Sequence, residues 1–189
     1  MRVGIMGGTF DPIHVGHLVA ASEVFSELAL DQVRFIPAGE PWQKDLRTIS
    51  PAIDRLAMVQ VAIQADPRFV ADDIEIRRDG PTYAVDTMKD LLTEHPENEY
   101  FWIVGDDVLA RITSWHSWQE FLDLVTVVAV NRESDADIEV PFDYVRVIMP
   151  EVRVSATALR ERLVAGKDCR YLVPQPTLDY IAAHDLYRS

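Results

Sequence analysis

The feature that most constrains this chain is a glycine-rich stretch close to its first residue, Gly7-Gly8-Thr9-Phe10-Asp11-Pro12-Ile13-His14-Val15-Gly16-His17. A short apolar run from Val3 to Met6 precedes the stretch and predicts a buried strand. Apolar residues at helical spacing follow it, at Leu18, Ala21, Phe25 and Leu28. The stretch therefore predicts a strand-to-helix turn, which is the place where open α/β folds bind ligands.

The residue types in this turn favour an anion. Gly7 and Gly8 allow the backbone to turn sharply and to come close to a bulky group. The first N–H groups of the following helix lack partners within it, and the helix dipole adds partial positive charge there. His14 and His17 are three residues apart, so they share a face once the helix has begun. An isolated histidine pair is more often a cap and a surface residue, but the glycines, the strand and the helix favour a phosphate site.

This stretch resembles the signature of the nucleotidylyltransferase superfamily, whose core is T/H-x-G-H. The dinucleotide pattern G-x-G-x-x-G and the P-loop pattern G-x-x-x-x-G-K-[ST] are both absent. The resemblance implies that His14 and His17 are catalytic and contact the phosphates of a nucleoside triphosphate. It also implies that ATP contacts the rest of the stretch, at Gly7, Gly8, Thr9, Phe10 and Gly16.

A second stretch, Val154-Ser155-Ala156-Thr157-Ala158-Leu159-Arg160, carries an independent signal. Ser155 is a predicted helix N-cap, and Arg160 near the first turn opposes the helix dipole unless an anion lies between. Alone, the pattern is typical of a capped helix with a solvated arginine. It resembles the superfamily's motif I-S-S-T-x-x-R, with Ala156 in place of one serine. The resemblance implies that Ser155, Thr157 and a catalytic Arg160 hold the triphosphate.

Strand-like and helix-like runs alternate along the chain, which predicts an α/β, Rossmann-like, doubly wound sheet of five to six mainly parallel strands with helices on both faces. Ser50 and Pro51 predict the N-cap and first residue of one helix. We expect a single domain over 1–189, with a C-terminal helical segment from about 155. The other strands are expected at 33–37, 69–76, 100–104, 125–130 and 144–149.

Composition narrows the function classes. The net charge of -13 argues against a general nucleic-acid partner, although local cations still allow an anionic small substrate. Cys169 is the only cysteine, which excludes an intrachain disulfide and indicates a reducing compartment, so we expect a cytoplasmic protein. The chain has no apolar run long enough for a membrane helix, and no membrane partner is expected. Homo-oligomerisation stays open.

The middle of the chain resembles the bacterial nicotinate mononucleotide adenylyltransferases. The resemblance rests on the Pro-Trp-Gln-Lys run ending at Lys44, on Gly80-Pro81-Thr82-Tyr83, on Gly105-Asp106, on Ser114-Trp115 and on Tyr171-Leu172-Val173-Pro174. It implies that Gly105 and Asp106 contact ATP. It also implies that nicotinate mononucleotide is bound by Lys44, Thr82, Tyr83, Trp115 and Arg132. Glu133 stands where the family usually has proline, which weakens the match at Arg132.

Elementary chemistry agrees with these assignments, although each residue also has a structural alternative. Trp115 offers a stacking face to a flat pyridine ring, and we assign the nearby Trp118 to packing. Backbone N–H groups at Thr82 and Tyr83 suit a carboxylate, although Thr82 is also a plausible N-cap for the next helix. Lys44 suits a phosphate, but most lysines are simply solvated. Asp106 suits a nucleoside hydroxyl or amine, or a helix cap.

The resemblance implies transfer of the adenylyl group of ATP to nicotinate mononucleotide in NAD biosynthesis, with nicotinate adenine dinucleotide and pyrophosphate as products. Because the attacking phosphate is already ionised, no protein base is required. Mg²⁺ is expected, held mainly by phosphates and water rather than by protein ligands. The alternatives are a sibling adenylyltransferase or cytidylyltransferase for another acceptor, a regulatory ATP-binding module, and an interaction protein with an acidic face.

Overall fold

The computed structural model describes residues 1–40, 49–131 and 138–188. Strands and helices alternate through most of this part of the chain. The elements are β1 (Arg2–Gly8), α1 (Val15–Glu27), β2 (Gln32–Pro37), α2 (Ala52–Ile63), β3 (Phe69–Ala71), α3 (Ala84–Glu94), β4 (Glu99–Gly105), α4 (Asp106–Leu109), η2 (Ile112–Ser114), α5 (Trp118–Leu124), β5 (Thr126–Asn131), β6 (Val145–Ile148), α6 (Ala156–Val164) and α7 (Gln175–Ala183).

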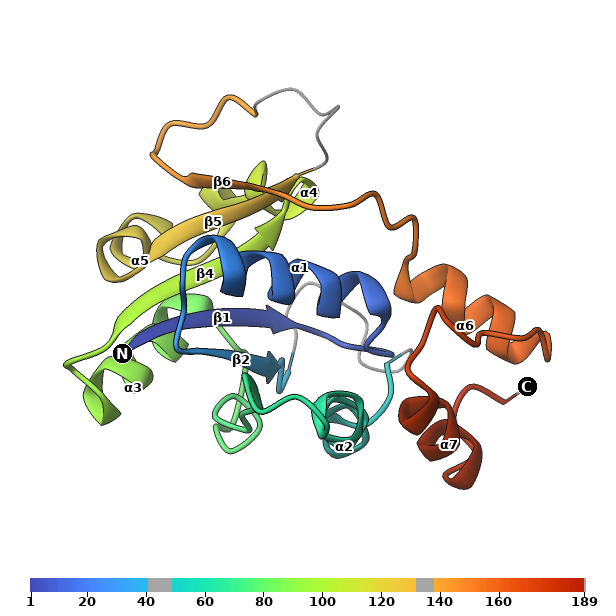
Figure 1. Ribbon diagram of the computed structural model, residues 1–189. Coiled ribbons are helices and arrows are strands. Elements are labelled where there is room, and N and C mark those ends of the chain that lie inside the picture. Colours follow the sequence, from blue (N-terminus) through green and yellow to red (C-terminus); the bar gives the residue numbers. More distant parts are fainter. Residues whose placement is uncertain (41–48, 132–137, 189) are drawn as a thin grey trace.

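The strands form one sheet in the order β3-β2-β1-β4-β5-β6, and every neighbouring pair is parallel (Figure 1). The order reverses between β1 and β4, because the chain first winds outward to β3 and then returns past β1. In sheets of this kind ligands bind outside the carboxyl ends of the strands at the reversal. The predicted α/β, doubly wound, parallel fold is confirmed.

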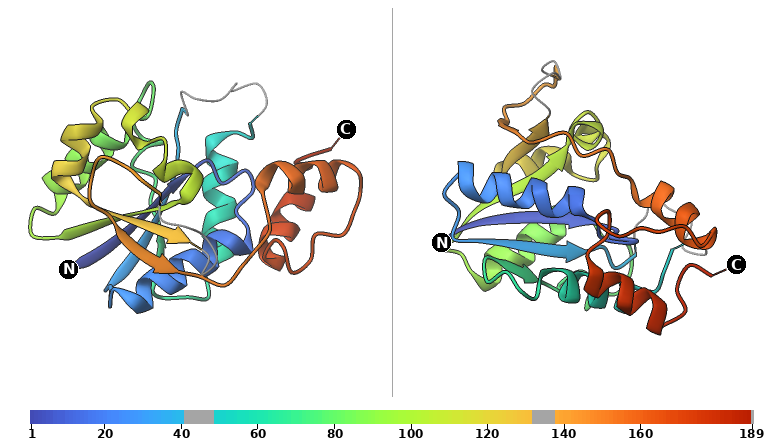
Figure 2. Two further views of the ribbon diagram at one scale, coloured as in Figure 1. Left: turned by 90° about the horizontal axis from the view of Figure 1, so that it is seen from above. Right: turned by 45° about the vertical axis from the view of Figure 1, so that its right-hand side comes forward.

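Helices cover both faces of the sheet. Buried residues of α1 and α2 pack on one face, and those of α3 and α5 pack on the other (Figures 1 and 2). The pleat of β4 divides its side chains between the two cores, with Trp102 on the α3 side and Ile103 on the α1 side. All residues from Tyr100 to Val104 are buried, which explains the unbroken apolar run of this central strand.

The expected end of the third strand and the expected N-cap of α2 were wrong. The third strand ends at Ala71 rather than at residue 76, because the Asp72 carboxylate accepts the Ile74 N–H at 3.0 Å and turns the chain. Ser50 is not the N-cap of α2, which is Pro51. The Ser50 N–H instead donates to the Asp11 carboxylate at 3.4 Å.

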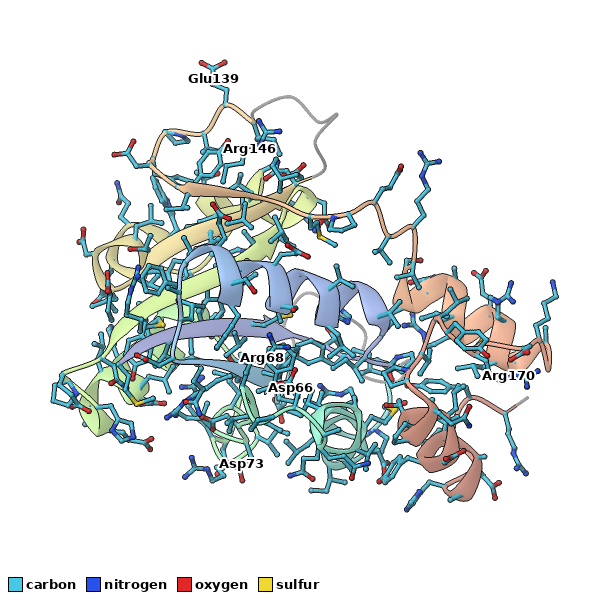
Figure 3. The ribbon with its side chains drawn as sticks, in the orientation of Figure 1. Asp66, Arg68, Asp73, Glu139, Arg146 and Arg170 are labelled. Carbon is cyan, nitrogen blue, oxygen red and sulfur yellow. The ribbon has the colours of Figure 1, made fainter. Side chains whose placement is uncertain are left out.

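The helices α6 and α7 lie beyond the carboxyl ends of β1 and β2 (Figures 1 and 2). Helix α7 docks on α2, where the Tyr180 hydroxyl donates to Asp54 at 2.8 Å and the Thr177 hydroxyl donates to the Met58 carbonyl at 3.2 Å. Between α6 and α7, Arg170 pairs with Asp168 at the outer end of this segment (Figure 3). Among the described residues, no helix combines the length and apolar character that a membrane span requires.

Candidate active site

A cleft of about 860 Å³ opens at the carboxyl ends of β1 and β4. Its walls come from the glycine turn, the start of α1, the loop before α3, the end of β4, the 115–116 turn and the start of α6. The lining residues include Gly7, Gly8, Thr9, His14, Gly16, His17, Glu75, Thr82, Tyr83, Gly105, Asp106, Arg111, Trp115, His116, Asn131 and Ser155. Most of the predicted site residues that the structure describes therefore meet in one place.

The two histidines form a fixed pair at one end of the cleft. His14 is the N-cap of α1, and its ring stacks on that of His17 with centroids 3.7 Å apart. The His14 N–H donates to His17 Nδ1 at 3.2 Å, so the neutral His17 imidazole carries its proton on Nε2. Phe10 does not line the cleft, and its ring instead packs edge-on against His17 at 5.0 Å.

Burial controls the charge of this pair. His14 is 7% exposed, and desolvation lowers its pKa from 6.5 to about 4. At neutral pH His14 is therefore an uncharged hydrogen-bonding group. The positive character of this end of the cleft then comes from the start of α1 and from the neighbouring Arg160, rather than from this imidazole.

The glycines of this stretch leave space for neighbouring side chains and do not produce a sharp backbone turn. Gly7 and Gly8 belong to β1, and neither has a positive φ, so the expected sharp turn at these residues is wrong. A Cβ on Gly7 would lie 2.9 Å from the Trp102 ring, and one on Gly8 would lie 3.2 Å from the Phe10 ring. A Cβ on Gly16 would lie 3.0 Å from Val154 Cγ1, which places the second motif directly against the first.

Arg160 joins the two motifs. Its Nη1 donates to the Asp11 carbonyl at 2.8 Å, and its Nη2 donates to Thr157 Oγ1 at 3.3 Å. Ser155 is the N-cap of α6, as predicted, and its Oγ accepts the Ala158 N–H at 3.3 Å. Ser155 lines the cleft, whereas Thr157 and Arg160 do not.

Aromatic side chains and the start of α3 line another part of the cleft. Trp115 lines it and is supported by Trp102 and Phe121, with ring centroids 6.3 and 5.4 Å away. Trp118 does not line the cleft and packs near Phe142 at 6.3 Å. Tyr83, which caps α3, lies beside the ring of His116 at 4.5 Å. A flat ring bound here would meet Trp115 on a rigid aromatic base.

Thr82 holds a loop as well as lining the cleft. Its N–H and its hydroxyl both donate to the Glu40 carbonyl, at 3.2 and 3.1 Å. The N–H that was expected to bind a carboxylate is therefore engaged with Glu40. Thr82 is also not the N-cap of α3, because Tyr83 takes that position. The start of α3 at Tyr83 and Ala84 still faces the cleft.

Several polar residues of the cleft were not predicted, among them Glu75, Asn131 and Arg111. Glu75 is buried, its Oε1 accepts the Thr87 hydroxyl at 2.7 Å, and burial raises its pKa to about 7. Asn131 is 2% exposed, and its Nδ2 donates to Asp106 Oδ1. Arg111 brings a cation to the cleft and donates to the Asp107 carbonyl at 2.8 Å. No motif in the sequence marks these residues, because only the packing of the strands brings them to the cleft.

Another unpredicted residue, Arg55, does not line the cleft but holds the backbone of the loops beside it. It is 1% exposed and donates to the carbonyls of Ser50, Thr9 and Gly39 at 3.0, 2.9 and 3.1 Å. A sequence signal exists for it, since Arg55 precedes Val59 by one helical turn and lies on the buried stripe of α2. Lys44 and Arg132, two predicted ligands of the mononucleotide, lie outside the described residues.

Fold and site together define a nucleotidyltransferase. A model of the cytidylyltransferase-like family matches residues 5–162, which is most of the chain. The described part of the chain agrees with that class, because both phosphate motifs border one cleft at the sheet's reversal point.

Curated relatives narrow the class further. A probable nicotinate-nucleotide adenylyltransferase of Saccharopolyspora erythraea is 45% identical over 191 residues, covering 100% of this chain and 90% of the relative. One from Corynebacterium glutamicum is 43% identical over 193 residues, covering 99% and 88%. The chain belongs to the nicotinate-nucleotide adenylyltransferase family and is an enzyme of NAD biosynthesis.

Solved structures agree in fold. The Plasmodium falciparum nicotinic acid mononucleotide adenylyltransferase, complexed with NaAD, superimposes with a TM-score of 0.81 at 19% identity, covering 98% of this chain and 97% of that one. A putative nicotinate-nucleotide adenylyltransferase from Vibrio parahaemolyticus gives a TM-score of 0.74 at 17% identity, covering 100% and 97%.

Proposed function

We propose that this cleft joins the adenylyl group of ATP to nicotinate mononucleotide, with nicotinate adenine dinucleotide and pyrophosphate as products. The observation that carries the proposal is the contact between the two motifs. Arg160 bonds to the Asp11 carbonyl at 2.8 Å, so the second motif stands beside the histidine pair. The phosphates of ATP then lie between them, and the mononucleotide lies toward Trp115.

The phosphate end is suited to ATP by its donors. Thr9 and the N–H groups of the glycine turn hold the α-phosphate, next to the start of α1. Ser155, Thr157 and Arg160 hold the β- and γ-phosphates at the start of α6. The Arg160 side chain is 30% exposed, so a phosphate bound at the start of α6 can reach it.

The reaction is an in-line displacement. A phosphate oxygen of the mononucleotide attacks the α-phosphorus, the new P–O bond forms, and the bond to the β-phosphate breaks as pyrophosphate leaves. The nucleophile is already ionised, so the protein acts by placement and by stabilising charge. His17 donates Nε2–H to the phosphoryl oxygens as charge builds on them, and the neutral His14 holds the His17 ring in place.

The aromatic end recognises the acceptor. Trp115 stacks on the pyridine ring, and the first N–H groups of α3 bind the nicotinate carboxylate. An amide offers fewer acceptors to these donors, so nicotinamide mononucleotide binds less well. Asp106, positioned by Asn131, accepts a hydrogen bond from a nucleoside hydroxyl, and Gly105 lets the nucleoside approach. Lys44 and Arg132 complete the mononucleotide phosphate site.

Mg²⁺ enters with ATP. The phosphate end of the cleft presents imidazoles, hydroxyls and N–H groups, which suit phosphate oxygens rather than a hard cation. Phosphates and water would therefore hold the ion, which would neutralise negative charge on the leaving pyrophosphate. We propose that residues 1–189 form a single domain. We place the protein in the cytoplasm, in keeping with its single buried Cys169.

Steady-state formation of the dinucleotide from ATP and nicotinate mononucleotide tests the proposal. Loss of one donor to the transition state costs about 3 kcal/mol, so His17→Ala should lower kcat about 100-fold with little change in either KM. His95→Ala, which removes a surface histidine paired with Glu97, is the matched control and should keep kcat. A His17→Ala variant with near-normal kcat contradicts the role of His17, and an inactive wild type contradicts the function.

A further inference from the structure

The carboxylate of Asp11 is buried at a point where three remote parts of the chain meet. Asp11 lies in the turn between β1 and α1, three residues before His14, and is 2% exposed. Its Oδ1 accepts the Tyr187 hydroxyl at 2.6 Å, and its Oδ2 accepts the Ser50 N–H at 3.4 Å. A buried carboxylate is costly unless its oxygens are hydrogen-bonded, so these partners determine where Asp11 can lie.

The Tyr187 hydroxyl is a dependable donor. Burial and the negative charge of Asp11 raise the pKa of Tyr187, so the phenol keeps its proton. The same hydroxyl lies 3.8 Å from Met58 Sδ, so it contacts α2 as well as the turn. Tyr187 itself has a left-handed backbone, with φ of 56°, a conformation that needs support from surrounding contacts.

The C-terminal segment, residues 155–188, forms hydrogen bonds with the turn on both sides of His14. Before His14, Tyr187 bonds to the Asp11 carboxylate and Arg160 bonds to the Asp11 carbonyl at 2.8 Å. After His14, the Val15 N–H donates to the Leu172 carbonyl at 3.0 Å. The views in Figures 1 and 2 agree that this segment stands against the end of β1 and the start of α1.

We propose that Tyr187 is a positioning residue for adenylyl transfer, which holds the histidine pair in its reactive place through the hydrogen bond to Asp11. This inference rests on the proposed function. Tyr187 does not line the cleft, so it acts through Asp11 and touches no substrate. Its loss lets the turn shift, and small shifts of groups that stabilise a transition state reduce turnover more than substrate binding.

The chain offers a matched control. Tyr180 is in the same segment, and its hydroxyl donates to a carboxylate, that of Asp54, at 2.8 Å. That bond docks α7 on α2 and does not reach the turn. Tyr180→Phe and Tyr187→Phe therefore each remove one hydroxyl and one hydrogen bond to an aspartate, but only Tyr187→Phe removes a partner of Asp11, which keeps its contacts with Ser50 and Arg160.

The experiment compares kcat, both KM values and the melting temperature of the two variants. We expect Tyr187→Phe to lower kcat about tenfold with both KM values within about twofold, and Tyr180→Phe to keep kcat within about twofold. Equal falls in kcat would overturn the proposal, because docking of the segment would explain both. Unchanged kcat in Tyr187→Phe overturns the proposal. A Tyr187→Phe chain that does not fold also overturns it, because Tyr187 would then be needed for folding rather than for positioning the histidine pair in a folded enzyme.

A double-mutant cycle tests the route through Asp11. Asp11→Ala should lower kcat at least as much as Tyr187→Phe, and adding Tyr187→Phe to it should lower kcat no further. A second tenfold fall in the double variant shows that Tyr187 acts without Asp11 and overturns the inference. A wild-type chain that forms no dinucleotide contradicts the proposed function instead, whereas an active wild type beside an equally active Tyr187→Phe contradicts only this inference.

Discussion

The guanidinium of Arg55 joins the two loops that frame the cleft, since it donates to the Thr9 carbonyl at 2.9 Å and to the Gly39 carbonyl at 3.1 Å. Thr9 belongs to the turn between β1 and α1. Gly39 is followed by Glu40, whose carbonyl accepts a hydrogen bond from the Thr82 hydroxyl. A single buried cation thus fixes the distance between the two ends of the site. Burial lowers the pKa of Arg55, and the negative charge of Asp11 opposes this shift more than that of any other group.

Replacing Arg55 should destabilise the fold strongly. Arg55→Met leaves three partly buried carbonyls without the Arg55 donor, and removing one partner from a buried charged network costs about 3 kcal/mol. Urea denaturation should show this loss of unfolding free energy. Arg77→Met removes an exposed arginine paired with Asp73 and should change stability by less than about 0.5 kcal/mol. Similar losses in both variants would contradict a supporting role for Arg55.

A methyl group at Gly16 should separate activity from stability. The added Cβ would lie 3.0 Å from Val154 Cγ1 and 3.1 Å from His14 Nδ1, so these side chains would have to shift by a few tenths of an ångström. We expect Gly16→Ala to lower kcat/KM at least about tenfold. The melting temperature should hardly fall, because alanine favours the helix by about 1 kcal/mol.

Adding Val154→Ala to Gly16→Ala tests whether the contact with Val154 causes the loss of activity. Shortening Val154 removes the closest of the two contacts, so the Gly16→Ala/Val154→Ala protein should regain part of the lost kcat/KM. No recovery would show that the contact with the second motif is not what excludes a side chain at Gly16.

The carboxyl of Glu75 should make stability fall as pH rises toward neutrality. Its pKa is raised by burial from 4.5 in the unfolded chain to about 7 in the fold, so between these values the folded state binds more protons. Stability is then greatest below about pH 4.5 for this group and falls by up to about 1.4 kcal/mol per pH unit until about pH 7.

Glu75→Gln isolates this contribution, because the amide keeps an oxygen for Thr87 but does not titrate. The unfolding free energy of the variant minus that of the wild type should increase from pH 4.5 to 7, as measured by urea denaturation at several pH values. A difference that stays constant across this range contradicts a proton held by Glu75.

Removing the indole of Trp115 should affect one substrate only. Stacking of an aromatic side chain on a base contributes about 1–3 kcal/mol, so Trp115→Ala should raise KM for nicotinate mononucleotide about tenfold. KM for ATP should stay within about twofold, because the phosphate end is separate. Trp118→Ala is the control, since that indole packs near Phe142 outside the cleft. Equal effects on the two substrates would indicate that Trp115 serves packing.

Much of the architecture could be predicted from local patterns. The unbroken apolar run from Tyr100 to Val104 indicated a central parallel strand, and the structure buries every one of these residues. The Asp72 turn shows where such patterns fail. Residues 69–76 look like a strand, yet the Asp72 side chain competes for the Ile74 N–H and ends β3 early.

The sequence by itself determined the alternation of strands and helices, the glycine turn that enters α1, and the two motifs that suit phosphate, because these depend on residues close together in the chain. Only the tertiary structure decided the partners of Asp11 at Ser50, Arg160 and Tyr187, the burial of Glu75, and the use of the Thr82 N–H by Glu40. Hydrogen bonds and desolvation act over a few ångströms in space. Which distant residues come that close is decided by how the elements pack.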